Sequence, residues 1–194
     1  MEDKYDEFAT AHNDLATNVE QLSTQLKNME EKLIDMEDRS HRNNLRLRGI
    51  PEEIPNDDLP SFIRGCLKAH APEIPTDMLL IDRMHRIPKP RHIPPMVPRD
   101  ILLRAHYFHV KEHILRSCRT RARPPEEYAT IRIYADLSAA TLRRRKEFSQ
   151  VTGALRAHGI RYKWGFPTKL IITKEGKTTV IQTPEDGEQK LQGW

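Results

Sequence analysis

Arginines alternate with leucines in residues 44–50, which read NLRLRGI. Arg46 and Arg48 fall on the positions between and after Leu45 and Leu47, a pattern that predicts a half-buried strand with its arginines on the open side. The planar guanidinium group of arginine offers paired N–H donors that match the oxygens of a phosphate. We therefore expect this strand to hold phosphate groups or to stack guanidinium planes on bases, and to discriminate poorly between base sequences.

Charge is distributed unevenly along the 194 residues, whose formal net charge is +4. Residues 1–38 contain eleven acidic residues and three lysines, a net charge of −8, whereas residues 39–194 contain 29 basic and 17 acidic residues, a net charge of +12. A strongly basic segment indicates a polyanionic partner. Nucleic acid is the first candidate, and the surface of an anionic membrane is the second.

A further group of basic residues lies near the C-terminus. It comprises a run of four (RRRK, residues 143–146) and the basic residues that alternate with aromatic ones in RYKWGFPTK, residues 161–169. Such interleaving is typical of grooves that bind single strands, and a solvated charged surface is the alternative. On these grounds we predict that the nucleic-acid-binding residues include Arg46, Arg48, Arg132, Arg143, Arg145, Lys146, Arg161, Lys163, Phe166 and Lys169.

Phe166 has two interpretations. It stands between a glycine and a proline, where the backbone turns, and Lys163 and Lys169 lie three residues to either side. One interpretation is a platform on which a base stacks between two phosphate-binding ammonium groups. The other is a plug of a small C-terminal core.

Residues that could support catalysis are few. His106, His109 and Glu112 have the spacing of one helix face, and Asp136 is a further carboxylate, but lone polar residues on a helix mostly face solvent. The nine histidines show no ligand spacing with cysteine or carboxylate, and no carboxylate cluster suits two-metal phosphoryl chemistry. We therefore predict no metal site, no cofactor and no enzymatic activity.

The remaining composition indicates an intracellular protein. Cys66 and Cys118 lie far apart in apolar-periodic segments, and we expect both to be buried, reduced thiols. No stretch approaches the roughly 18 apolar residues of a membrane span, and no signal peptide opens the chain.

Residues 1–41 carry a heptad repeat over five heptads, without proline or glycine. Nine of the ten a and d positions, which we call the seam, are apolar, and the tenth is His12. This strict spacing predicts a coiled coil, because a helix lying on a globular core usually has a wider apolar stripe. The pattern does not fix the number of strands. The seam residues that we expect to mediate oligomerisation are Phe8, Leu15, Val19, Leu22, Leu26, Met29, Leu33 and Met36.

Residues 42–135 predict a βαββαβ domain. After the first strand we expect a helix over 57–70, capped by Asp57 or Asn56, then a strand over 78–87, a proline-rich loop over 88–99, a strand over 100–108, a helix over 109–122 and a strand over 129–136. This order is that of ferredoxin-like domains and RNA-recognition motifs. The usual aromatic residues of RNA-recognition motifs are missing, since Arg46 stands where the first central strand normally offers a ring.

Residues 136–194 predict a small basic α+β domain. A helix over 136–159, with Leu142 and Phe148 among its inward residues, begins at a Ser or Asp cap and ends at Gly159. Three strands follow it, the last two joined at the KEGK turn. The whole chain is therefore expected to be α+β, with an N-terminal coiled coil, a ferredoxin-like RNA-recognition motif and this C-terminal domain.

Five segments carry a family resemblance. They read MEDRSHRNNLRLRGIPE, MHRIPKP, KEHILRSCRTRA, ADLSAATLRRRKEF and YKWGFPTKLII, and they run in order through residues 1–190. In this combination the chain resembles the RNA-binding protein encoded by the first open reading frame of LINE-type (long interspersed element) retrotransposons. The sequence begins close to its first heptad, so we expect either a fragment of a longer protein or a shorter relative.

The resemblance implies a fold, a function and further site residues. It implies a parallel homotrimeric coiled coil and a protein that coats the single-stranded RNA of its own element, with single-stranded DNA as a further ligand. It also implies a nucleic-acid chaperone that supports retrotransposition within cytoplasmic ribonucleoprotein particles. The nucleus is a second location that we leave open. A motif after the second helix of the central domain falls on residues 119–122, which adds Arg119 and Arg121 to the predicted site, although its glycine is replaced by alanine. The paired arginines of the C-terminal domain fall on Arg145 and Lys146, and a further motif falls on residues 166–170.

A different class of function is a coiled-coil scaffold that binds acidic proteins or membranes without a specific role for RNA. The sequence does not give the preferred RNA sequence, the host, the element or any higher-order polymerisation.

Overall fold

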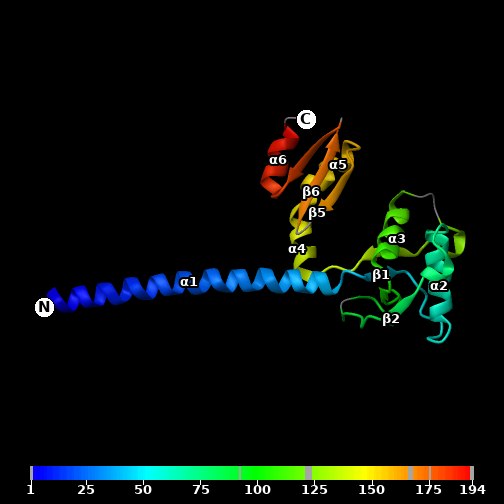
Figure 1. Cartoon of the computed structure of the whole chain (residues 1–194), viewed down its shortest axis with the longest axis horizontal. Helices are drawn as coiled ribbons and strands as arrows, with labels where there is room; N and C mark the ends of the chain where they lie inside the picture. Colours follow the sequence, from blue (N-terminus) through cyan, green and yellow to red (C-terminus); the bar gives the residue numbers. More distant parts are fainter. Residues whose placement is uncertain (1, 92, 121–123, 166–167, 175, 193–194) are drawn as a thin grey trace. The chain divides into compact units, whose positions relative to one another are not determined.

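The structure, a computed structural model, describes residues 2–91, 93–120, 124–165, 168–174 and 176–192 (Figure 1). The chain forms two compact units. The central unit comprises Ser40–Leu137, and the terminal unit comprises Met1–Arg39 together with Ser138–Trp194. The bounds 1–41, 42–135 and 136–194 of the three expected domains stay a prediction.

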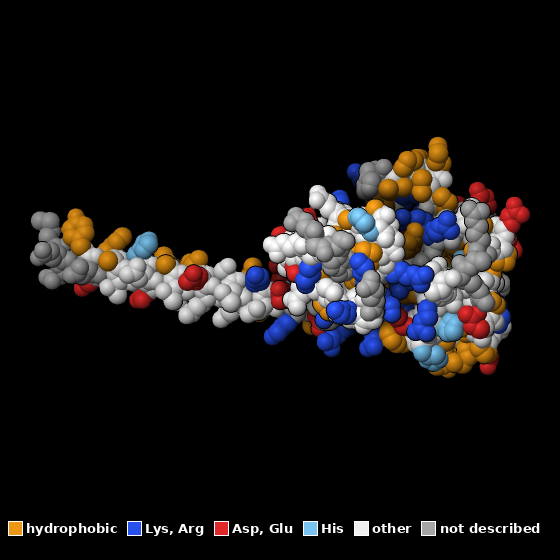
Figure 2. All heavy atoms as spheres, turned by 90° about the horizontal axis from the view of Figure 1, so that it is seen from above, with side chains coloured by type: hydrophobic (Ala, Val, Ile, Leu, Met, Phe, Trp, Pro, Cys, Tyr) orange, Lys and Arg blue, Asp and Glu red, His pale blue; other side chains and the backbone are white. Residues whose placement is uncertain are grey.

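Helix α1 spans Glu2–Ser40 and confirms the long N-terminal helix. Its 39 residues extend over about 58 Å at 1.5 Å per residue. The seam does not pack on the protein's own core: its large apolar side chains, from Tyr5 to Met36, are 57–77% exposed. Figure 2 shows hydrophobic side chains in a row along one edge of this helix. The coiled coil itself stays a prediction, because one chain is described.

The end of α1 is joined to the start of helix α4, Ala139–Glu147, by hydrogen bonds. The backbone N–H of Ser138 donates to Asp38 Oδ1 at 2.8 Å, and Thr141 Oγ1 donates to Asp38 Oδ2 at 2.5 Å. Ser138 is also the N-cap residue of α4, since its Oγ accepts from the backbone N–H of Thr141 at 3.1 Å. The predicted serine cap is thus confirmed, and the carboxylate of Asp38 sits where a helix N-terminus favours negative charge.

The central unit is built on a four-stranded antiparallel sheet. Its strands are β1 (Asn44–Arg48), β2 (Ile81–Arg86), β3 (Ile101–Ala105) and β4 (Arg132–Ala135), in the order β2-β3-β1-β4. Helix α2 (Leu59–His70) follows β1, and helix α3 (Phe108–Thr120) follows β3, with 3₁₀ turns η1 (Thr76–Met78) and η2 (Glu126–Tyr128) before β2 and β4. The strand–helix–strand–strand–helix–strand order agrees with the prediction.

The core of the central unit lies between the sheet and the two helices. Leu45 and Leu47 of β1 are fully buried there, with Ile101 of β3, Ile63 of α2 and Ile114 of α3. The side chains on the other face of each strand are therefore left away from both helices. Helix α2 begins two residues later than predicted. Its N-cap is Asp58, not Asp57 or Asn56, and the side chain of Asp58 makes no capping hydrogen bond; a proline follows within the first turn.

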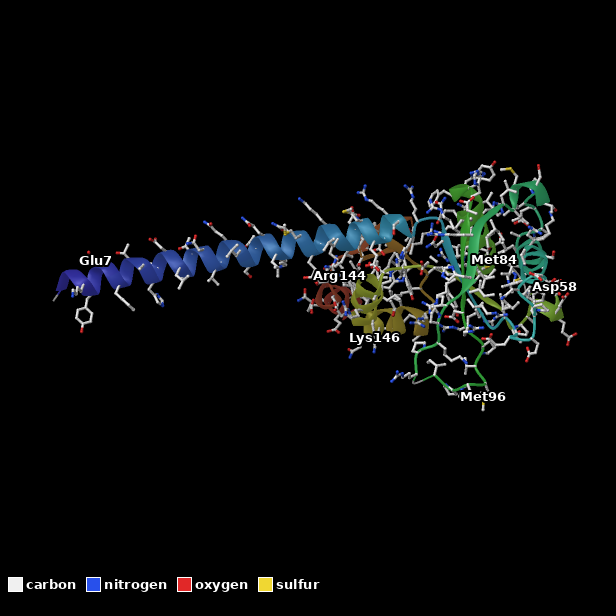
Figure 3. All side chains as sticks on the ribbon, turned by 90° about the horizontal axis from the view of Figure 1, so that it is seen from below. Glu7, Asp58, Met84, Met96, Arg144 and Lys146 are labelled. Carbon is white, nitrogen blue, oxygen red and sulfur yellow. The ribbon has the colours of Figure 1, made fainter. Side chains whose placement is uncertain are left out.

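The proline-rich segment between β2 and β3 folds back on itself. Lys89 Nζ donates to the carbonyl oxygens of Pro94 and Pro95, at 3.2 and 2.8 Å. The base of the loop is held by Glu52, which accepts from the guanidinium group and the backbone N–H of Arg99. Met96 is left exposed at the tip (Figure 3).

The C-terminal part of the terminal unit packs helices on a three-stranded sheet. Helices α4, α5 (Ser149–Ala157) and α6 (Pro184–Gln192) accompany strands β5 (Tyr162–Gly165), β6 (Lys169–Lys174) and β7 (Lys177–Ile181), in the order β5-β6-β7. The predicted helix over 136–159 is two helices, because the chain turns at Phe148, whose ring is buried against Trp164. Leu142 is 48% exposed and is not the inward residue that we predicted.

Candidate functional site

The sheet of the central unit carries arginine on the side that the helices leave uncovered. Arg46 and Arg48 alternate with buried Leu45 and Leu47, as predicted. Paired residues of neighbouring antiparallel strands point to the same face, so the strand registers identify the rest of this surface. We call it the open face, and its residues are Arg46, Arg48, Arg83, His85, Leu102, Arg104, Arg132 and Tyr134, with the buried Asn44 at its edge.

Asp100 organises the arginines of β1. Its Oδ2 accepts from Arg46 Nε at 2.7 Å and from Arg48 Nη2 at 3.1 Å, and its Oδ1 accepts from Arg48 Nε at 3.1 Å. Burial by itself raises the pKa of Asp100, but the hydrogen bonds from the two arginines outweigh it, and the pKa lies below its usual value. Hydrogen bonding to Asp100 in turn raises the pKa of Arg48. Both guanidinium groups are thus held in place by one carboxylate.

A second carboxylate lies near the β2 edge. Asp82 is 3.6 Å from Arg104 Nε and 2.7 Å from His106 Nδ1. Together with Asp100, it gives two carboxylates against the five arginines of the open face. The face therefore keeps an excess of positive charge, as a surface that binds a polyanion requires.

Two arginines of the open face were missed by sequence analysis. Arg104 and Arg83 are paired across β3 and β2, and β2 has a register shift between Ile81 and Arg83. The alternation of Arg83 and His85 with Met84 in the sequence could have indicated Arg83, because Met84 packs against the core and its two neighbours on the strand face the other way. Arg132, which was predicted, lies on the open face opposite Arg48.

Other predicted residues of the central unit are not brought to the open face. Arg119 is exposed near the end of α3, a helix on the covered side of the sheet. Arg121 lies outside the described residues. Their part in binding stays a prediction.

The basic residues of the C-terminal part form two groups. On α4, Arg143 and Lys146 are exposed, and Arg145 is half-buried with its guanidinium carbon 4.8 Å from the centre of the Trp164 ring. Figure 3 marks Lys146 and the neighbouring Arg144 on this helix. Arg145 is therefore engaged by an aromatic ring of its own domain through a cation–π contact.

The second group lies on the three-stranded sheet. Lys163 is exposed, whereas its neighbours Tyr162 and Trp164 pack against the hydrophobic core of this domain. Side chains alternate between the two faces of a strand, so these two aromatic rings do not share a groove with Lys163, contrary to our interpretation of the sequence. Arg161 is exposed and Lys169 is half-buried, opposite Gly165. Phe166 lies outside the described residues, and both interpretations of it stay open.

The residues considered for catalysis have other partners. His106 contacts Asp82, and the rings of His109 and Tyr107 lie 5.5 Å apart. Within the described part of the chain, no three His, Cys, Asp or Glu residues could together hold a metal ion. Asp136 accepts from the side-chain amide of Asn44 at 3.0 Å.

The two cysteines differ in burial. Cys66 is buried, as predicted, whereas Cys118 is only partly buried, and neither forms a disulfide. Burial raises the pKa of both thiols, that of Cys66 to about 12, so neither is an activated nucleophile. Among the described residues, no helix is long and apolar enough to cross a membrane.

Comparisons with known proteins give a consistent relationship. No protein-family model matches the chain. The mouse LINE-1 retrotransposable element ORF1 protein is 28% identical over 151 residues, which are 75% of this chain and 42% of that protein. The mouse LINE-1 type transposase domain-containing protein 1 is 27% identical, over 75% of this chain and 19% of that protein. The human protein of the same name is 30% identical, over 74% of this chain and 17% of that protein.

The chain thus spans less than half the length of the curated relatives it matches. The similarity to each of them nevertheless extends over about three quarters of this chain, so the chain is similar to the LINE-1 ORF1 protein and to its LINE-1 type transposase domain-containing relatives in mouse and human.

Proposed function

We propose that this protein binds single-stranded RNA, with single-stranded DNA as a further ligand, through the open face and the basic C-terminal domain. The observation that carries the proposal is the open face itself, where five arginines face away from the helices and the two carboxylates paired with them, Asp82 and Asp100, leave an excess of positive charge. The proposed central domain is a variant RNA-recognition motif that contacts the phosphate backbone more than the bases.

Weak sequence selectivity follows from this composition. Contacts from arginine to phosphate fix the position of a strand but carry no sequence information. A protein that holds strands in this way, and releases them readily, is suited to act as a nucleic-acid chaperone. The similarity to the LINE-1 ORF1 protein supports a role in a retrotransposon ribonucleoprotein particle. We further propose that this particle is cytoplasmic and that the protein has no enzymatic activity.

The exposed seam of α1 supports oligomerisation. We propose a parallel homotrimeric coiled coil through residues 5–36, which carries several copies of the binding surface. Linked sites bind one strand with higher avidity, because the second binding event is intramolecular. The coiled coil of α1 thereby compensates for the modest affinity of each individual RNA-binding surface.

Salt dependence of RNA binding tests the proposal. The purified chain should bind a single strand of roughly 30–50 nucleotides, long enough for more than one site. Its log K should fall against log salt with a slope of about −0.7 per phosphate contacted. The double substitution Arg48→Gln/Arg132→Gln should make the slope shallower by about 1.4 for each binding surface engaged.

A matched control removes the same charge elsewhere. Arg64→Gln/Arg116→Gln changes two exposed arginines on the helices of the covered side and should leave the slope unchanged. The open face would be rejected as the binding surface if log K of the unmodified chain did not depend on log salt. It would also be rejected if the two double variants reduced the salt slope equally. Stronger binding to vesicles of anionic phospholipid than to RNA would favour a membrane partner instead.

A further inference from the structure

Tyr134 is an exposed aromatic residue in the middle of the arginines. It lies on β4 directly opposite Arg46, on the open face, and its side chain is 47% exposed. The tyrosine rings at positions 107 and 128 of this unit instead pack against the core. An aromatic ring at this place has neither a core to fill nor a helix to cover it.

The guanidinium group of Arg48 lies beside this ring. Its central carbon is 5.8 Å from the ring centre, within the range of a cation–π contact. Two of the five N–H donors of an arginine are used here by Asp100, which holds the group in place. No further hydrogen-bond partner of this guanidinium occurs in the described part of the chain, so its other donors are available to a ligand.

The surroundings of the ring match the parts of a nucleotide. Arg46 is the cross-strand neighbour of Tyr134, about 5 Å away between Cβ atoms, and Arg132 lies two residues along the same strand, about 7 Å away. A flat apolar surface thus has positive groups on its sides, at distances that suit a base with its adjoining phosphates. Neither a peptide of acidic residues nor a lipid headgroup requires the ring.

We propose that Tyr134 and Arg48 form a stacking site for one unpaired nucleobase, with Asp100 as the residue that positions Arg48. This inference rests on the proposed function, because it assigns a base to one position of the same surface. Stacking on a ring is tolerant of base identity, since every base has a π face. The site adds affinity for single strands without adding strong sequence preference.

A comparison of two strands tests the site. One is a uridine oligonucleotide of about ten nucleotides, and the other is the same backbone with abasic positions. Tyr134→Ala should bind the uridine strand about tenfold more weakly, as expected for one stacked base, and should bind the abasic strand as the unmodified protein does. The salt slope should not change, because no phosphate contact is lost.

Three further measurements isolate the ring and its partner. Tyr134→Phe keeps the ring and should stay within about twofold of the unmodified affinity. Asp100→Asn releases Arg48 and removes a negative charge, so it strengthens binding to both strands. Loss of positioning should nevertheless lower the ratio of uridine to abasic affinity, which a purely electrostatic change would leave constant. Melting curves establish that the variants remain folded.

The outcomes separate this inference from the proposed function. An unchanged uridine-to-abasic ratio in folded Tyr134→Ala would overturn the stacking site, while steep salt dependence of the unmodified protein would leave the proposed function standing. Failure of the unmodified protein to bind either strand would reject both.

Discussion

The exposed seam of α1 yields a prediction whose magnitude follows from the structure. Leu22 and Leu26 are 63% and 70% exposed in the single chain. Full burial of a leucine contributes about 1.5–3 kcal/mol, so burying the exposed two thirds in a coiled coil contributes about 1–2 kcal/mol for each residue. The two leucines together contribute about 2–4 kcal/mol per chain.

Replacing both leucines by aspartate should dissociate the assembly. Even a dimer loses about 4–8 kcal/mol, which raises its dissociation constant by about 10³- to 10⁶-fold, and a trimer loses more. Uncompensated carboxylates in the seam add further cost. Light scattering after gel filtration at about 10 μM should report an oligomer for the unmodified chain and a monomer for Leu22→Asp/Leu26→Asp.

A control variant separates seam position from charge. Gln21→Asp/Asn28→Asp adds the same two charges at exposed positions outside the seam and should remain oligomeric. A monomeric mass for the unmodified chain, or an oligomeric mass for the leucine variant, would refute the coiled coil.

Two further predictions concern stability. Glu52→Gln should lower the urea midpoint at pH 7, because hydrogen bonds from Arg99 hold the pKa of Glu52 at about 2 in the folded state. This contribution is complete above the unfolded pKa of about 4.5 and is lost as the pH falls towards 2, so the two midpoints should converge there, and a constant difference would contradict the assignment. Gly49→Ala should destabilise the central unit by about 1–3 kcal/mol in denaturant titrations, because its φ is +88° and a Cβ would lie 2.9 Å from the carbonyl oxygen of Thr130. Gly153→Ala, in a helix with open space around it, should instead stabilise its domain, and equal losses at both glycines would show that the backbone at Gly49 is not the cause.

Local patterns were sufficient to predict most elements of the central unit. The alternation in β1 gave the correct face for Leu45, Leu47, Arg46 and Arg48, because the period of a strand is two. The same rule, applied to residues 161–164, would have separated Lys163 from Tyr162 and Trp164. We grouped them by proximity in sequence, and the structure places them on opposite faces.

Contacts between distant residues could not be predicted in this way. Asp100 lies 54 positions from Arg46, and no local pattern indicates that it would join two arginines of β1. The register shift between Ile81 and Arg83 likewise depends on the pairing of β2 with β3. Helix α6, by contrast, was missed although its signals are local: Thr183 Oγ1 accepts from the backbone N–H of Asp186, and the Asp186 carboxylate pairs with Lys190.

The hydrogen bonds of Asp38 have a consequence for local unfolding. The last turn of α1 supplies the acceptors for the first turn of α4, at Ser138 and Thr141. Fraying of the last turn of α1 leaves the buried backbone N–H of Ser138 and the buried hydroxyl of Thr141 without the carboxylate that accepts from them, which costs free energy. The two turns are therefore expected to open and close as one cooperative unit. The end of α1 and the start of α4 then share a single opening equilibrium, although Asp38 and Ser138 are 100 residues apart in the chain.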